Sequence, residues 1–186
     1  FLADFKKHDG NLDLGKNVVV IGGGNTAMDT ARAAKRTKGV EHVYLVYRRT
    51  KRYMPADEEE LQLAIEDGVE FLELLAPVGA ENGKLKCSVM ELGAPDASGR
   101  RSPVDTGKTE EYPADTIIAA IGETIDTSLY AELGIEMDAK GRPVVDGNMM
   151  TTEAGVYAVG DSRRGPATVV EAIADSAKAA AAIAGI

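Results

Sequence analysis

The sequence predicts an α/β fold in which a parallel β-sheet carries an inserted antiparallel β-meander. The stretch "VVVIGGGNTAMDTARAAKR" places four consecutive apolar β-formers, Val18–Ile21, before a glycine turn and an alanine-rich helix. This order is typical of a strand–turn–helix unit whose strand is covered on both faces. The stretch "KLKCSVMEL" instead alternates between apolar and polar residues, which indicates a strand with one buried face.

The first half of the chain yields its elements in order. The opening "FLADFKK" reads as part of a helix. We expect a helix over 25–38, with the small residues Ala27, Ala31 and Ala34 against the sheet, and a strand over 43–47. After Pro55, acidic residues suit the positive end of a helix dipole, and Gly68 ends that helix. Its predicted buried stripe is Leu61, Ala64 and Ile65, and a strand is expected over 69–75.

The second half begins with the meander, over 83–112, in which Leu85, Cys87 and Val89 share one face. Cys87 is therefore expected to be a buried structural thiol. A buried strand should return over 116–121, and a crossover segment over 123–133 should follow. Short strands are expected around 144–145 and 156–159, and a final helix over 168–183.

Composition excludes several classes of function. The formal net charge of -9 over 186 residues argues against a nucleic-acid-binding or anionic-membrane surface. No apolar run approaches the ~18 residues needed to span a bilayer, and a cytoplasmic protein is the expectation. One cysteine supplies neither a disulfide framework, nor a CxxC redox pair, nor the ligands of an iron–sulfur cluster.

The glycine turn matches the pattern G-x-G-x-x-A, through Gly22, Gly24 and Ala27. The first glycine permits the tight turn, the second lets a pyrophosphate approach the backbone, and the alanine allows close helix–strand contact. Backbone N–H groups of Asn25 and Thr26, at the start of the helix, can then face the phosphates. The turn therefore predicts a dinucleotide site, the alternative being a glycine-rich turn without a ligand.

The end of the second strand indicates which dinucleotide. An NAD site usually has an acidic residue there, which binds the ribose hydroxyls, whereas this chain has "YRRTKR". Arg48, Arg49, Lys51 and Arg52 form a basic cluster in an acidic protein, and a 2′-phosphate is the anion that would match it. The sequence thus favours NADPH over NADH, and a solvated basic loop is the alternative.

The motifs "GKNVVVIGGGNTAMDTAR", "VYRRTKRYMPA", "AIG" and "GVYAVGD", in this order, resemble the NADPH-dependent flavoprotein family of the glutamate synthase small subunit and dihydropyrimidine dehydrogenase. The stretches "ELGAPDASGRRSPV" and "RRGPATVVEAI" look most like the selenate reductase subunit within that group. The resemblance covers nearly the whole chain from Gly15 onward. It implies a Rossmann-like FAD/NAD(P)-binding fold, with an NADPH domain inserted into an FAD domain.

The resemblance also implies cofactor-binding residues. For the NADPH pyrophosphate, 2′-phosphate and nicotinamide they are Gly22, Gly24, Asn25, Thr26, Ala27, Arg48, Arg49, Arg52 and Asp29. For the segment beside both nucleotides and for FAD they are Ala120, Ile121, Gly122, Gly160, Asp161, Thr168 and Val169. Thr168 is equally a plain N-cap, and Asp161 is alternatively a strand-end turn residue. Neither a catalytic acid or base nor a metal ligand is expected.

These matches predict three segments: a leading segment over 1–14, an NADPH-binding Rossmann domain over 15–123, and the C-terminal part of an FAD domain over 124–186. No glycine-rich turn for FAD and no cluster cysteines precede Gly22. The chain therefore looks like a fragment that binds NADPH, holds FAD weakly or not at all, and depends on an N-terminal FAD/iron–sulfur region or a partner iron–sulfur subunit. A non-catalytic NADP(H)-binding regulatory module is the alternative, and the absence of CxxC disfavours a disulfide reductase.

Overall fold

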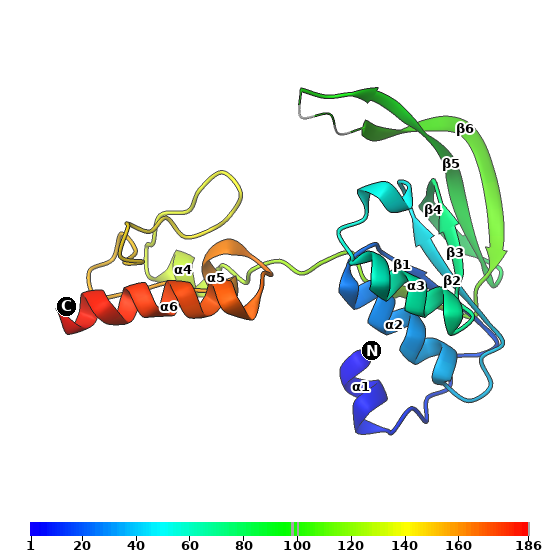
Figure 1. The fold of residues 1–186 in the computed structure, drawn as a ribbon, viewed down its shortest axis with the longest axis horizontal. Coiled ribbons are helices and arrows are strands. Elements are labelled where there is room, and N and C mark those ends of the chain that lie inside the picture. Colours follow the sequence, from blue (N-terminus) through cyan, green and yellow to red (C-terminus); the bar gives the residue numbers. More distant parts are fainter. Residues whose placement is uncertain (98, 100, 186) are drawn as a thin grey trace. The chain divides into compact units, whose positions relative to one another are not determined.

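The computed structural model describes residues 1–97, 99 and 101–185, shown as a ribbon in Figure 1. The chain divides into two compact units, Phe1–Ile121 and Gly122–Ile186, and each is described by itself.

A four-stranded parallel sheet forms the centre of the first unit. Its strand order is β3-β2-β1-β7, and the bounds are β1 Asn17–Ile21, β2 His42–Tyr47, β3 Glu70–Glu73 and β7 Thr116–Ala119. β1 pairs in parallel with β2 on one side and with β7 on the other. The parallel sheet predicted from the sequence is confirmed. Since β1 and β2 run in the same direction, the glycine turn and the basic cluster leave the sheet at the same edge.

Helices cover one face of this sheet (Figure 1). They are α2 Asn25–Arg36 and α3 Glu58–Glu66, while α1 Leu2–Lys7 lies against α2, and a 3₁₀ turn, η1, spans Lys51–Tyr53. The small residues Ala27, Ala31 and Ala34 are fully buried, which lets α2 approach the strands closely. In α3 the predicted stripe is wrong at one position, because Ile65 is 43% exposed. It is rotated by about 100° from buried Ala64 and so leaves the packed face.

The three-stranded antiparallel sheet packs on the opposite face of the parallel sheet (Figure 1). It comprises β4 Leu75–Glu81, β5 Lys84–Pro95 and β6 Arg101–Pro113, in the order β4-β5-β6. The predicted meander is confirmed, and so is the buried thiol of Cys87. The single strand expected over 69–75 is wrong, because Leu74 has φ +57 and divides it between the two sheets.

Both faces of β1 are buried, as its continuous apolar run predicts. Val18 and Val20 belong to the core beneath the helices, whereas Val19 packs with Leu85 and Cys87 in the core beneath the antiparallel sheet. Burying each such valine contributes roughly 1.5–3 kcal/mol. β7 differs from its prediction as a buried strand over 116–121: it ends at Ala119, and Ile117 is 38% exposed. β7 is an edge strand of the sheet, so it has a strand neighbour on one side only.

The second unit contains α4 Ser128–Glu132, α5 Asp161–Arg164 and α6 Val169–Ala184. The final helix is confirmed. The short strands predicted around 144–145 and 156–159 are wrong, because Val145 and Tyr157 each form one isolated bridge, to Thr151 and Met150 respectively. Single bridges between loop residues do not build a ladder. Nowhere in the described parts of the chain is a helix both long enough and apolar enough to cross a membrane.

Candidate nucleotide-binding site

The glycine turn after β1 packs closely against the neighbouring strand. The backbone N–H of Gly22 donates to the carbonyl oxygen of Val46, at 3.1 Å. A β-carbon on Gly22 would collide with the carbonyl oxygen of Ala120 and would lie 2.9 Å from the β-carbon of Ala27. Gly22 therefore lacks a side chain because of packing inside the protein, and Ala27 is small for the same reason.

Gly24 differs, because nothing in the structure lies within 4 Å of where its β-carbon would stand. It is the N-cap residue of α2, with φ -97 and no capping side chain. The N–H groups of Asn25 and Thr26, which follow it, have no partner in the described part of the chain. An uncapped helix start with open space in front of it suits an anion.

The basic cluster begins directly after β2. Arg48 and Arg52 are exposed and Arg49 is half-buried. In the described ranges none of these three guanidinium groups pairs with a carboxylate, whereas Arg32 and Arg36 both reach Asp67 at 2.8 Å. Within the described residues, no carboxylate therefore neutralises the positive charge of these arginines, although the protein has a net charge of -9.

Arg49 carries a further signal. Its Nε is the single buried side-chain nitrogen or oxygen without a hydrogen-bond partner among the described residues. Leaving a buried donor unpaired costs about 1–3 kcal/mol. A phosphate bound by the outer nitrogens of this guanidinium group would offset that cost, because it adds charge-assisted hydrogen bonds. Arg49 also offers planar paired donors, which match phosphate geometry better than an ammonium group does.

The segment after the basic cluster is fastened to the glycine turn. The hydroxyl of Tyr47 donates to the carbonyl oxygen of Tyr53 at 2.7 Å, and the N–H of Ala56 donates to the carbonyl oxygen of Gly23 at 3.0 Å. Asp57, at the start of α3, exchanges two hydrogen bonds with the side chain of Asn25. The sequence pattern indicates Asp57 only as one of several carboxylates that suit a helix dipole, because contacts with residues so distant in the chain leave no local signal.

The other residues predicted for the NADPH half of the site make few contacts with the glycine turn or the basic cluster. Asp29 is exposed on α2. Ala120 donates its N–H to the carbonyl oxygen of Ile21 at 2.7 Å, and so lies beside the turn, while Ile121 is 76% exposed. Gly122 belongs to the second unit and has φ +111.

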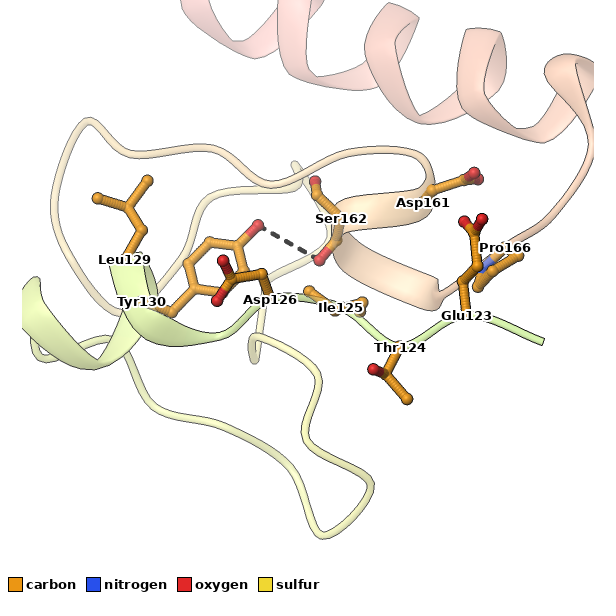
Figure 2. A pocket seen from close by; sticks show the side chains of 9 residues that line it. All are labelled: Glu123, Thr124, Ile125, Asp126, Leu129, Tyr130, Asp161, Ser162 and Pro166. Carbon is orange, nitrogen blue, oxygen red and sulfur yellow. Dashed lines mark hydrogen bonds between the residues drawn. The ribbon is translucent and has the colours of Figure 1, made fainter. Parts of the chain in front are cut away.

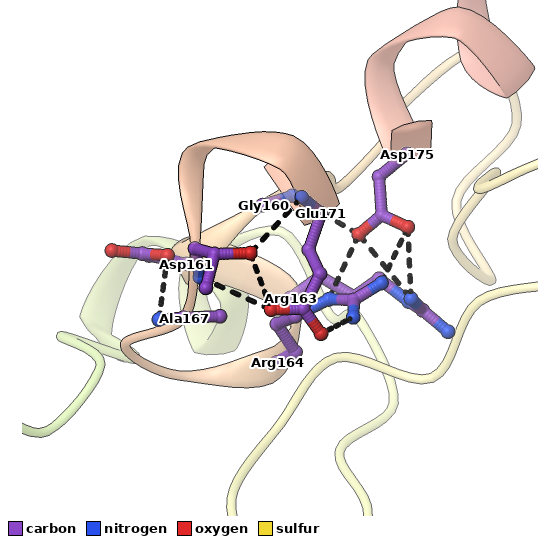
Figure 3. Close-up of polar contacts among 8 residues, drawn as sticks. Gly160, Asp161, Arg163, Arg164, Ala167, Glu171 and Asp175 are labelled. Atoms are coloured by element: carbon purple, nitrogen blue, oxygen red, sulfur yellow. Dashed lines mark hydrogen bonds and ion pairs between the residues drawn. The ribbon is translucent and has the colours of Figure 1, made fainter. Parts of the chain in front are cut away.

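In the second unit, Gly160 and Asp161 lie where α5 begins. Gly160 has φ +58, its N–H donates to Asp175 at 3.3 Å, and a β-carbon on it would lie 3.2 Å from that of Ala172 on α6. One carboxylate oxygen of Asp161 accepts the N–H of Ala167 at 3.2 Å. The two hydrogen bonds are drawn in Figure 3. The turn is therefore held closely against α6.

A buried acid on α6 anchors the two arginines of α5 (Figure 3). Asp175 is 2% exposed and pairs with Arg164 at 2.6 Å and with Arg163 at 3.3 Å. The hydrogen bond from Arg164, together with the bonds and charge of Arg163, holds the pKa of the Asp175 carboxyl below its usual value. Sequence reasoning missed this network, whose only signal is a lone acid in an alanine-rich stretch.

Thr168 is the N-cap of α6. Its hydroxyl oxygen accepts the N–H of Glu171 at 3.3 Å, and the Glu171 carboxylate accepts the N–H of Thr168 at 3.1 Å. These reciprocal bonds form a capping box. Val169 and Val170, which follow, are 76% and 75% exposed. The plain N-cap role of Thr168 is thus observed, and among the described residues the N–H groups of Val169 and Val170 have no partner.

A cavity of about 300 Å³ lies within the second unit and is shown in Figure 2. Three carboxylates line it, those of Glu123, Asp126 and Asp161, together with apolar side chains such as Leu129. The hydroxyl of Tyr130 donates to the carbonyl oxygen of Ser162 at 3.3 Å across its wall. Carboxylates accept hydrogen bonds and repel phosphates, so the cavity suits a group that carries hydroxyl donors.

The chain matches known proteins over most of its length. Residues 3–176 match the family model described as pyridine nucleotide-disulphide oxidoreductase. The chain is 46% identical to YgfK of Escherichia coli (strain K12) over 184 residues, covering 98% of this chain and 18% of the relative. It is 40% identical to the glutamate synthase [NADPH] small chain of the same organism, covering 89% of this chain and 38% of that protein.

Among solved structures, the chain is similar to T. acidophilum thioredoxin reductase, with a TM-score of 0.70 and 27% identity. The match covers 94% of this chain and 53% of that one. The chain therefore spans well under half of the two curated relatives and about half of the solved structure. The family match extends over more than half of the chain and includes both the glycine turn and the basic cluster. The chain belongs to the pyridine nucleotide-disulphide oxidoreductase family.

Proposed function

We propose that this chain is the NADPH-binding module of a flavin-dependent oxidoreductase. The observation that carries the proposal is the buried Nε of Arg49, which has no hydrogen-bond partner in the part of the chain that the structure describes. It lies in a basic cluster at the edge of the sheet where the uncapped glycine turn also opens. The turn would take the pyrophosphate, and Arg48, Arg49 and Arg52 would take the 2′-phosphate.

Residues 15–123 would form the NADPH domain and residues 124–186 the C-terminal part of an FAD domain. The first turn of α6 suits the flavin pyrimidine ring, because a helix N-terminus stabilises negative charge there. The carboxylate of Asp161 and the cavity beside it suit a hydroxyl-bearing ribityl chain. When bound, the two cofactors supply hydride transfer from NADPH to FAD, with electrons passing on to iron–sulfur clusters.

The chain's own residues contribute binding and orientation. Backbone N–H groups of the turn and the guanidinium groups hold the coenzyme at both phosphate positions, and this fixes where its nicotinamide lies. The remaining parts of the flavin site, and the iron–sulfur clusters, would belong to protein outside this chain. The small share of the relatives that the chain spans, 18% and 38%, supports that division.

Titration of NADPH and NADH against the purified chain tests the proposal. We expect clear preference for NADPH, because each charge-assisted bond to a 2′-phosphate contributes roughly 1.5–3 kcal/mol. The double variant Arg48→Ala/Arg49→Ala should lose the preference and flatten the salt dependence of binding. Lys86→Ala/Lys108→Ala is the matched control, since both lysines are exposed on the antiparallel sheet. Equal affinities for the two coenzymes in the unaltered chain would refute the proposal.

A further inference from the structure

The segment that carries the basic cluster is tied to the glycine turn on both sides of η1. On one side, the ring of Tyr47 packs so closely on Gly23 that a β-carbon there would lie 3.0 Å from Cζ of the ring. The hydroxyl of the same tyrosine holds the carbonyl of Tyr53. On the other side, the N–H of Ala56 reaches the carbonyl of Gly23. We call residues 48–57, with these ties, the basic strap.

Asn25 and Asp57 form the last tie of the basic strap. The side-chain amide of Asn25 donates to the Asp57 carboxylate at 3.1 Å, and the N–H of Asp57 donates to the amide oxygen of Asn25 at 3.0 Å. Both ends of the Asn25 amide are thereby used on the strap, while its backbone N–H stays at the open start of α2. One residue therefore belongs to the proposed pyrophosphate turn and also holds the segment with the arginines.

The position of Asp57 suggests that this tie has a purpose beyond local stability. Asp57 is the N-cap residue of α3, yet its carboxylate makes no capping hydrogen bond. An aspartate in that position ordinarily caps its own helix and so stabilises it. Here the carboxylate reaches instead to a residue 32 positions earlier, on another helix.

We propose that the Asn25–Asp57 pair is a positioning device that sets the distance between the pyrophosphate turn and the arginines, and thereby the coenzyme selectivity. The inference rests on the proposed NADPH function. Arginine-to-phosphate bonds depend strongly on distance and angle. Loosening the strap therefore weakens contacts to the 2′-phosphate and leaves the pyrophosphate cradle at Gly24 intact, so binding of NADPH falls and binding of NADH does not.

The experiment measures dissociation constants of NADPH and NADH for the unaltered chain and for three variants. Asp57→Ser removes the carboxylate that bonds to Asn25 but keeps a hydroxyl that can cap α3, so the helix stays formed. Asp57→Asn keeps an acceptor oxygen within reach of Asn25. Glu58→Ala is the matched control, because it removes one exposed carboxylate next to Asp57 and disturbs no side-chain contact in the described structure.

We expect Asp57→Ser to reduce the ratio of NADH to NADPH dissociation constants by about tenfold, mostly through NADPH. Asp57→Asn and Glu58→Ala should keep the ratio. Circular dichroism of each variant shows that α3 persists. If Asp57→Ser keeps the ratio, or weakens both coenzymes equally, the positioning role is overturned while the proposed function stands. If the unaltered chain shows no preference, the proposed function falls and the positioning role with it.

Discussion

The α-carbon of Gly22 faces the carbonyl oxygen of Ala120 so closely that no β-carbon fits between them. This contact joins the end of β1 to the end of β7, and it explains one glycine of the turn by packing alone. Gly24, two residues later, is surrounded by open space. The two glycines of one motif therefore have different physical causes, and they respond differently to the same substitution.

Gly22→Ala and Gly24→Ala separate these causes. Gly22→Ala should lower the free energy of unfolding by about 1–3 kcal/mol, because the backbone oxygen of Ala120 has little freedom to move away. Gly24→Ala should fold with a much smaller loss, since an N-cap alanine is only modestly unfavourable, but should bind NADPH far more weakly. Thermal unfolding and coenzyme titration check both, with Gly79→Ala, also in open space, as the control. If Gly24→Ala bound NADPH as tightly as the unaltered chain does, Gly24 would not lie against the pyrophosphate.

Arg49→Met keeps the apolar stem of this side chain and removes the guanidinium group. Because the Nε is buried without a partner, the coenzyme-free variant should be at least as stable as the unaltered chain. Loss of a charge-assisted bond should weaken NADPH binding about 10- to 100-fold and leave NADH binding unchanged. Thermal melts with and without NADPH measure both effects at once. A clear loss of stability without coenzyme would show that the Nε has a partner within the protein.

Acidification should loosen α5 from α6. The pKa of Asp175 is lowered in the folded chain by Arg164 and Arg163, so its contribution to stability is fully present above the unfolded value, near pH 4. It is lost as the pH falls from there through the lower folded value. The protection factors of α6 amides, which are corrected for the slower intrinsic exchange in acid, should therefore fall below about pH 4.

Asp175→Asn is the test of that assignment. It should accelerate exchange in α6 at neutral pH by at least about tenfold, because two partly buried arginines lose their common counter-ion. It should also reduce the acid response of the same amides. Asp126→Asn is the control, an exposed aspartate of the second unit whose pKa is likewise lowered. An unchanged acid response in Asp175→Asn would assign that response to other carboxyl groups.

The thiol of Cys87 should be unreactive in the folded chain. Burial raises its pKa to about 11, so at pH 8 roughly one molecule in a thousand carries the thiolate. A thiol-specific reagent should label the folded chain very slowly and the denatured chain at once. Rapid labelling of the folded chain would place the antiparallel sheet's inner face in contact with solvent.

Sequence patterns predicted the elements whose own residues determine them. The run at Val18–Ile21 is apolar on both faces, the alanines of α2 recur at helical spacing, and β5 alternates. A strand was predicted where β7 lies, but its exposure and its end at Ala119 were not, and neither were the isolated bridges near Val145. Both depend on which neighbouring segments the folded chain supplies. The break between β3 and β4 at Leu74 was not predicted either, because a leucine side chain gives no sign of a left-handed backbone conformation.

The candidate site likewise has a part that the sequence predicts and a part that it does not. The glycine turn and the basic cluster are local, so their residue types and spacing reveal them. The ties between Asn25 and Asp57 and between Arg164 and Asp175 join residues 32 and 11 positions apart through tertiary structure. No periodicity specifies such pairs. The positions that hold the arginines in place were therefore visible only in the folded chain.

A crystal structure of the chain with NADP⁺ tests the central claim most directly. We expect the 2′-phosphate within about 3 Å of a guanidinium nitrogen of Arg48, Arg49 or Arg52, and the pyrophosphate against Gly24 and the N–H groups of Asn25 and Thr26. An adenosine end bound elsewhere on the protein, with none of these three guanidinium groups in contact with a phosphate, would contradict this expectation.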